Sequence, residues 1–191
     1  MENKSKALFI SSMNYGLYLG IVMIVLALLL FFFDIKPIGF KSLLISVVSL
    51  AITIVGIVYS TKKIRTNVLG GEMTFAQGLL IGVMVTFVAV LISSLYSYIQ
   101  NTIIDPDYMK NFLEAQKEWM YEFMSSKGVS EDQIEKAIEG MEDKIAEMNP
   151  LKTMLTSIIS GTILGFIISL ITSAILKKKN DNPFTESQII E

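Results

Sequence analysis

The sequence of 191 residues contains no cysteine and no histidine. Without cysteine there is no disulfide, no thiol nucleophile and no thiolate ligand for zinc, and a lipoprotein acyl anchor has no attachment point. Without histidine there is no imidazole general base and no imidazole switch that titrates near neutral pH. We therefore expect a protein that is not an enzyme, with no catalytic residues, no metal site and no cofactor.

Charged residues are scarce over four long apolar stretches and crowded between them. The formal net charge of −2, with no extended basic stripe, argues against nucleic acid as a partner. Apolar runs of this length fit the hydrocarbon core of a bilayer as helices. The predicted fold class is all-α, a polytopic membrane protein with four transmembrane helices at about 11–33, 41–61, 75–99 and 150–179. We expect the polar residues 180–191 to form a disordered tail.

Small residues recur at intervals of four in three of the apolar stretches, which places them on one face of a helix. The last stretch carries six of them: Thr153, Ser157, Gly161, Gly165, Ser169 and Ser173. Three stretches hold a glycine pair at this spacing, namely Gly16 and Gly20, Gly78 and Gly82, and Gly161 and Gly165. Such pairs let helix backbones approach closely in a membrane, either within one chain or across a homodimer. We expect packing within the chain, because four spans need internal faces in any case.

The segment between the third and fourth spans, residues 105–149, holds twelve acidic residues and five lysines. Gly128 is suited to the C′ position that ends a helix. Ser130-Glu-Asp-Gln133 has the pattern of a capping box, which begins the next helix. The apolar residues that follow step at intervals of four and three, as in a narrow helix seam: Ile134, Ile138, Met141, Ile145 and Met148. These features predict an acidic helical hairpin.

The first helix of this hairpin carries an apolar cluster formed by Phe112, Trp119, Met120 and Phe123. Three interpretations are open for it. The cluster could pack against the second hairpin helix, lie on the bilayer surface, or contact a protein partner. One helix seam is narrower than this apolar face, so we expect part of it to stay uncovered by the hairpin alone.

If the chain crosses the membrane four times, Lys36 and Lys41 fall on one side, and a larger group of eight basic residues near the span ends falls on the opposite side. These eight are Lys4, Lys6, Lys62, Lys63, Arg65, Lys177, Lys178 and Lys179. The positive-inside rule then places both termini in the cytoplasm of a bacterium. The same rule places the acidic hairpin outside the inner membrane.

The end of the third span has a distinctive run, Tyr96-Ser-Tyr-Ile-Gln-Asn-Thr-Ile-Ile-Asp-Pro-Asp-Tyr108. Together with the four spans, the glycine-rich start of span three and the acidic segment, this run resembles domain-of-unknown-function family 4199. Members of that family are small four-span inner-membrane proteins of the Bacteroidota. The resemblance covers nearly the whole chain up to the tail. It implies a fold and a membrane but no activity, so it assigns no functional residues.

Between the lysines near their ends, the predicted spans contain no Asp, Glu, Lys or Arg, which argues against an ion-coupled or proton-coupled transporter. The leading hypothesis is a non-enzymatic structural or accessory subunit that presents the hairpin to an envelope protein, or that forms a homo-oligomer. The alternative is a small passive or lipid-directed transporter with a groove lined by the small-residue faces. Membrane lipid is an expected partner in both cases.

Overall fold

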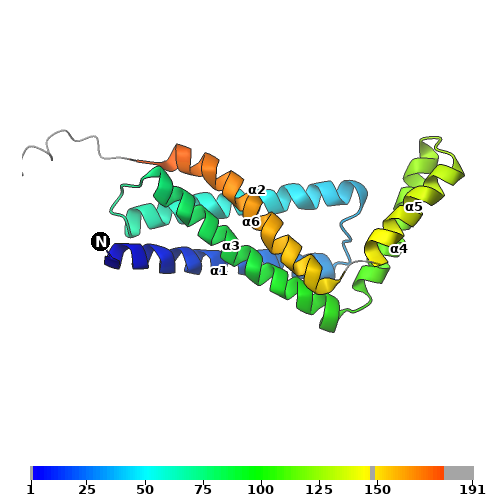
Figure 1. Cartoon of the computed structure of the whole chain (residues 1–191), viewed down its shortest axis with the longest axis horizontal. Helices are drawn as coiled ribbons and strands as arrows, with labels where there is room; N and C mark the ends of the chain where they lie inside the picture. Colours follow the sequence, from blue (N-terminus) through cyan, green and yellow to red (C-terminus); the bar gives the residue numbers. More distant parts are fainter. Residues whose placement is uncertain (1, 147–148, 179–191) are drawn as a thin grey trace, which may run out of the picture.

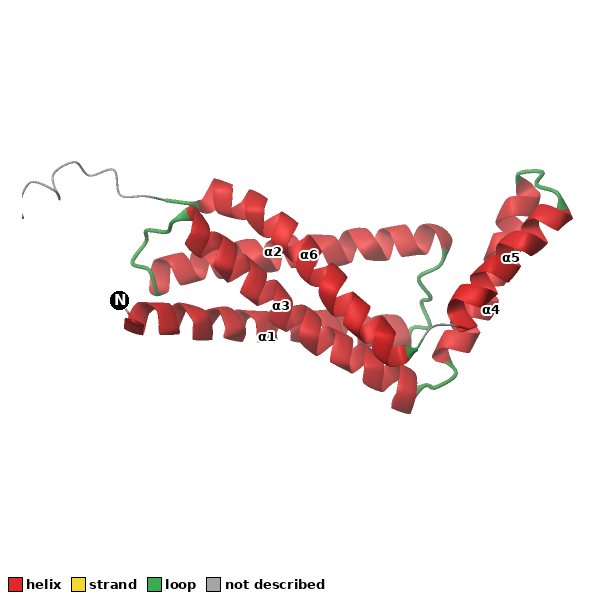
Figure 2. Ribbon diagram, viewed as in Figure 1, coloured by secondary structure: helices red, strands yellow, loops and turns green. Residues whose placement is uncertain are grey.

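The computed structural model describes residues 2–146 and 149–178, and the regular secondary structure of these ranges is helical (Figures 1 and 2). The helices are α1 (Glu2–Phe32), α2 (Gly39–Asn67), α3 (Phe75–Ile99), the π-helix η1 (Gln100–Ile104), α4 (Tyr108–Ser126), α5 (Glu131–Ala146) and α6 (Pro150–Leu176). Four helical segments are long and apolar enough to cross a membrane: α1, α2, α3 with η1, and α6. The all-α, four-span prediction is confirmed. The predicted tail at 180–191 lies outside the described residues.

Helix α3 lies at the centre of the bundle, and α1 and α6 make the most extensive contacts with it (Figure 1). The helix begins after Thr74, which forms a capping box with Gln77. The buried apolar cluster around α3 draws on α1, α2 and the connection before α3: Leu8, Leu19, Ile64, Met73, Ile81, Val85 and Ala89. The core is therefore narrow and centred on one helix.

Small residues on both helices bring α3 and α6 together. Three glycines face a hydroxyl residue of the other helix so closely that an added Cβ would collide with it. The pairs are Gly78 with Ser173, Gly82 with Ser169, and Gly165 with Thr86. The positions rise along α3 while they fall along α6, so the two helices are antiparallel. The Thr86 hydroxyl donates to the Gly82 carbonyl oxygen at 2.8 Å, so this buried polar group is satisfied within its own helix.

Hydrogen bonds link different helices at the end of the bundle where the described chain begins and ends. The guanidinium of Arg65 donates to the carbonyl oxygen of Leu176 at 2.9 Å, which caps the C-terminal end of α6. The backbones of Met73 and Lys178 exchange two hydrogen bonds, at 2.8 and 2.9 Å. These contacts hold α2, the start of α3 and the end of α6 together.

Helix α2 packs against the bundle only through its C-terminal half, where Ile57, Thr61 and Ile64 are buried. In its N-terminal half, Leu43 and Val47 are 57% and 56% exposed. The helix also extends to Asn67, beyond the predicted limit near 61, and α1 begins at Glu2 rather than near 11. Hydropathy marks the part of a helix that lies in lipid, whereas backbone hydrogen bonding continues into the polar flanks.

The two shorter helices, α4 and α5, lie side by side beyond the other end of the bundle (Figure 1). Helix α4 begins at Tyr108, two residues after Pro106, and Gly128 follows it with φ +75° in the left-handed region. Lys117 of α4 forms an ion pair with Glu142 of α5, and Ile134 is buried. Of the predicted seam, Met148 and the Ile145 side chain lie outside the described residues. That this pair is an external hairpin stays a prediction.

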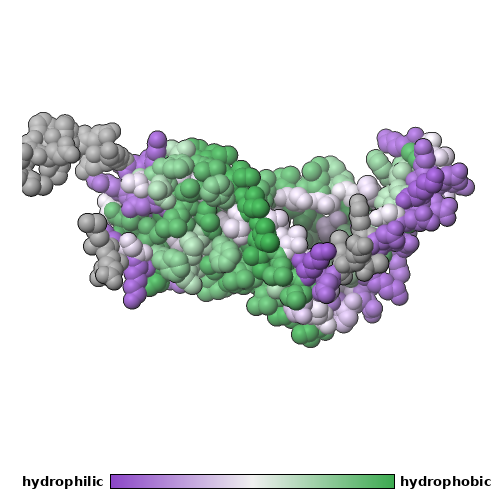
Figure 3. Space-filling model, in the orientation of Figure 1, coloured by the Kyte–Doolittle hydropathy of each residue, from purple (hydrophilic) through white to green (hydrophobic). Residues whose placement is uncertain are grey.

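Apolar residues cover the surface of the four long helices, and polar residues gather at both ends (Figure 3). Phe9, Val55 and Ile159, for example, are 47%, 66% and 62% exposed. A water-soluble protein does not expose such a continuous apolar surface, whereas a helix bundle in lipid requires one. The chain is therefore a multi-pass membrane protein.

Candidate functional site

All six glycines of the predicted pairs lie at contacts between helices of this chain. The glycines of α3 contact α6, and those of α6 contact α3. A Cβ added to Gly161 of α6, for example, would lie 2.8 Å from Cγ2 of Val90 in α3. In α1, a Cβ added to Gly16 would lie 2.8 Å from the Val85 carbonyl oxygen, and one added to Gly20 would lie 3.2 Å from that of Ala89. These glycines serve the packing of the spans onto α3.

The aromatic cluster of α4 lies partly against the start of α2. A Cβ added to Gly39 would lie 2.5 Å from Nε1 of the Trp119 indole, so the ring rests directly on the backbone of that glycine. The Trp119 and Phe123 rings stack with centroids 5.2 Å apart, and the two residues are 39% and 48% exposed. Met120 is half-buried, and Phe112 stacks instead on Tyr108 at 6.4 Å.

Helix α5 leaves much of this cluster uncovered, since α4 contains no buried residue. We use the name aromatic face for the stacked pair Trp119 and Phe123. It is the part of the predicted cluster in which both rings are exposed and stacked on each other.

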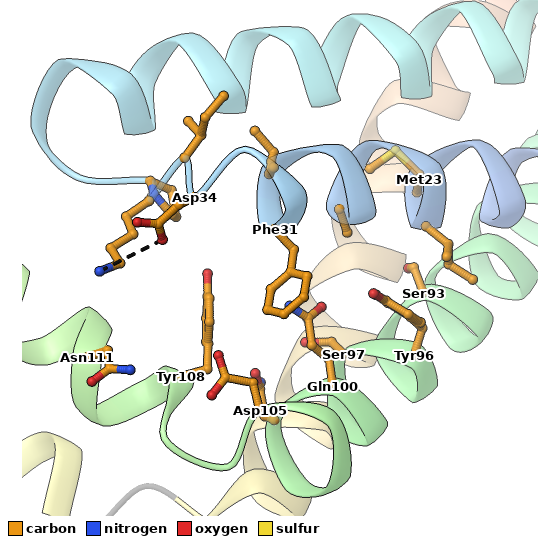
Figure 4. Close-up of a pocket in the computed structure, with 17 residues that line it drawn as sticks. Met23, Phe31, Asp34, Ser93, Tyr96, Ser97, Gln100, Asp105, Tyr108 and Asn111 are labelled. Atoms are coloured by element: carbon orange, nitrogen blue, oxygen red, sulfur yellow. Dashed lines mark ion pairs between the residues drawn. The ribbon is translucent and has the colours of Figure 1, made fainter.

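A polar pocket of about 250 Å³, which we call the end pocket, lies where α1, α3, η1 and α4 converge (Figure 4). Its polar lining is drawn from the α1–α2 connection, α3, η1 and the start of α4: Asp34, Lys36, Ser93, Tyr96, Ser97, Gln100, Asn101, Asp105, Tyr108 and Asn111. The α1 wall is apolar and reaches from Phe31 inward to Met23, about 12 Å along the helix. The pocket is thus polar on one side, apolar on the other, and open at a membrane edge.

Two carboxylates approach the end pocket from different elements. Asp34 lies two residues after the end of α1 with φ +47°, an uncommon conformation for a residue with a side chain, and its carboxylate lies 4.0 Å from the Lys36 ammonium. Asp105 follows η1, and its N–H donates to the Gln100 carbonyl oxygen at 2.8 Å. In Figure 4 the Tyr108 ring lies between Asp34 and Asp105, and its hydroxyl points toward the α1–α2 connection, which carries Asp34.

The pKa of Tyr108 is affected by this arrangement. Burial raises the pKa of the Tyr108 phenol above its ordinary value, and the charges of Asp105 and then Asp34 raise it further. The fields of both carboxylates therefore converge on one hydroxyl. Among the described residues, no three acidic side chains gather closely enough to hold a metal ion.

A second polar pocket, of about 210 Å³, lies on the other side of α3, against the start of α6. It shares Ser93, Ser97 and Asn101 with the end pocket and adds Thr153 and Ser157. The last turns of the α3–η1 segment are therefore polar on two sides, although they belong to an apolar span.

Sequence reasoning did not find the end pocket. The available signal was the pair Gln100 and Asn101, two amides inside the last turn of an apolar run. The Asp105–Tyr108 stretch was noticed only as part of a family resemblance. What brings Asp34 to the same place is the bend after α1, which the sequence alone does not specify.

An apolar groove of about 690 Å³ separates α1 from α2 on the surface of the bundle. Its lining includes Tyr15, Leu19 and Val22 of α1 and Ile52 and Tyr59 of α2. The groove is open along its length to the surface that faces lipid.

The chain was compared with known families, curated proteins and solved structures. The family described as "Protein of unknown function (DUF4199)" matches residues 14–178. The chain belongs to this family, as the resemblance implied. Neither a curated protein nor a solved structure matches it.

Proposed function

We propose that this member of the DUF4199 family is a non-enzymatic accessory subunit of a bacterial inner membrane, which presents α4 to a protein partner in the envelope. The observation that carries the proposal is the aromatic face. Two stacked rings, 39% and 48% exposed, sit on a helix that α5 covers only in part. Exposed aromatic side chains with fixed positions are what protein interfaces use as anchors.

The composition of the chain supports the non-enzymatic part of this proposal. The chain has no cysteine and no histidine, so the nucleophiles and general bases of many hydrolases and transferases are missing. Asp34 and Asp105 in the end pocket would be the remaining acids, and they approach it beside a lysine and several amides.

Site-specific crosslinking tests the proposal, because the chain has no native cysteine. Phe123→Cys, labelled with a benzophenone maleimide, should give a discrete protein adduct after irradiation of intact membranes. Tyr121→Cys is the matched control, since Tyr121 lies two positions away on another side of α4 and is also 48% exposed. Equal adduct patterns from the two positions, or no protein adduct from residue 123, would refute the proposal.

The basic residues support the orientation that the proposal needs. Lys62, Lys63 and Arg65 lie at the same end of the bundle as Lys177 and Lys178, and this end would face the cytoplasm (Figure 1). Helices α4 and α5 would then face the outside. In intact cells, a membrane-impermeant maleimide should label Ser125→Cys at the end of α4 but not Asn67→Cys at the end of α2. The reverse pattern would invert the topology and remove the envelope partner.

A lipid-directed transporter is the second candidate, and the apolar groove is the observation that favours it. A groove between two weakly packed spans offers a path along which a lipid chain could lie. Val22→Trp should fill the groove and slow the exchange of a fluorescent phospholipid between leaflets of proteoliposomes. Leu29→Trp is the control, because Leu29 is about equally exposed on α1 and does not line the groove. Exchange no faster than in protein-free liposomes would exclude this candidate.

A further inference from the structure

Gln100 gives the strongest indication that the end pocket takes a polar ligand. The residue is only 8% exposed and lines the pocket, so the accessible part of this polar side chain faces the pocket. A primary amide offers two donors and one acceptor. Because these groups line the pocket, a ligand that donates and accepts hydrogen bonds can pair with the amide of Gln100 there.

The charges of the pocket specify what kind of ligand fits. Asp34 and Asp105 line the pocket from two sides, and their charges add to the larger effect of burial in raising the pKa of Tyr108. Lys36 places one ammonium group at the same rim, 4.0 Å from Asp34. A cationic group that donates hydrogen bonds suits the two carboxylates, and an adjacent anionic group suits Lys36.

The position of the pocket indicates where such a ligand comes from. The polar rim lies just beyond Phe32 and Ile104, where α1 and the α3–η1 segment end. From there the apolar α1 wall reaches about 12 Å inward, which is less than half the thickness of a bilayer core. A zwitterionic headgroup at the rim with a hydrocarbon chain along the wall would match both surfaces.

We propose that the end pocket binds the phosphoethanolamine headgroup of a membrane phospholipid. The primary ammonium donates to Asp34 and Asp105, and the phosphate accepts from Lys36 and from the Gln100 amide. The proposal is independent of the accessory-subunit role, because it rests on the end pocket and not on the aromatic face.

Competition between two lipids tests the assignment. The full-length protein in mild detergent is given equal amounts of dioleoyl phosphatidylethanolamine and dioleoyl phosphatidylcholine, and native mass spectrometry measures which lipid stays bound. Choline carries a positive charge but no N–H donor, so only ethanolamine can donate to the carboxylates. We expect wild-type protein to retain ethanolamine lipid over choline lipid by at least about tenfold.

Three variants locate the preference. Asp105→Asn and Gln100→Leu should bring the ratio of the two bound lipids close to one. Asp107→Asn should leave it unchanged, because Asp107 is an exposed carboxylate two positions from Asp105 that does not line the pocket. The wild-type comparison needs no substitution, so a variant that fails to fold does not remove the test.

Several results would overturn the proposal. One is equal retention of the two lipids by wild-type protein, and another is an unchanged preference in both Asp105→Asn and Gln100→Leu. In a second competition, preferential retention of dioleoyl phosphatidylglycerol over dioleoyl phosphatidylethanolamine would show an anion site at Lys36 instead. If soluble glycerophosphoethanolamine bound as tightly as the lipid, the headgroup chemistry would stand but the assignment to a bilayer lipid would be wrong.

Discussion

The contact between Trp119 and Gly39 joins α4 to the connection between the first two spans. Removing this contact should therefore have a specific, measurable effect. Gly39 has φ +55°, and a Cβ at this position would lie 2.5 Å from Nε1 and 2.7 Å from Cε2 of the indole. Ordinary contacts between such atoms are about 3.5–4.0 Å. In Gly39→Ala the ring must therefore move away from the α2 backbone by about 1 Å or more.

Two costs add up in this variant, and a control separates them. An alanine in the left-handed region costs roughly 1–2 kcal/mol of backbone strain. Gly70 has φ +78° and nothing within 4 Å of an added Cβ, so Gly70→Ala carries the backbone cost alone. Only Gly39→Ala should also displace Trp119 and loosen α4 from the α1–α2 connection.

Tryptophan fluorescence measures this displacement directly, because Trp119 is the one tryptophan in the chain. Gly39→Ala should shift the emission to longer wavelength and increase quenching by acrylamide, as the indole becomes more exposed to water. Gly70→Ala should match the wild type in both respects. Identical quenching of all three proteins would show that Trp119 does not rest on Gly39.

Three further predictions concern packing, electrostatics and capping. Gly16→Ala should lower the free energy of unfolding by about 1–3 kcal/mol more than Gly56→Ala in an SDS titration followed by circular dichroism. The reason is that Gly16 faces the Val85 carbonyl oxygen at 2.8 Å, whereas Gly56 faces the movable methyl groups of Leu19; equal stabilities would contradict it. Asp105→Asn should lower the pKa of Tyr108 yet leave it above the ordinary value, since burial is the larger cause. The tyrosinate absorbance of each protein minus that of its Tyr108→Phe counterpart measures this pKa, and an unchanged value would show that the Asp105 charge does not act there. Asn149→Ala should cost about 1 kcal/mol in the same SDS titration, because the Asn149 side chain accepts from the Leu151 N–H at 2.9 Å at the start of α6. A stability equal to that of the wild type would mean that this cap contributes nothing.

The sequence predicted the features that depend on local pattern. Four spans follow from the length and composition of the apolar runs, and their existence does not depend on how they pack. The last turn of α4 is another local feature, because Gly128 can adopt φ +75° at no steric cost. Family membership was predictable for a similar reason, since the order of spans and the run before Tyr108 are properties of the chain itself.

Features that depend on the packing of distant segments were not predictable. The small residues of the last span indicate a close partner but do not name it, and only the structure pairs Gly165 with Thr86 of α3. The same holds for the end pocket, where Asp34 and Asp105 are separated by two spans in sequence. Their convergence depends on the bend after α1 and on the wide turns of η1, where a π-helix commonly marks a functional site.

The two ends of the bundle differ in how closely the helices are held together. At the terminal end, Arg65 bonds to Leu176 and the Met73 and Lys178 backbones pair, so the spans are tied together. At the other end, the N-terminal half of α2 leaves the bundle and polar pockets open on both sides of α3. Helix α4 connects these features, because Tyr108 stands in the end pocket while Trp119 rests on Gly39. A ligand in the pocket and a partner on the aromatic face would therefore act on the same helix, about three turns apart.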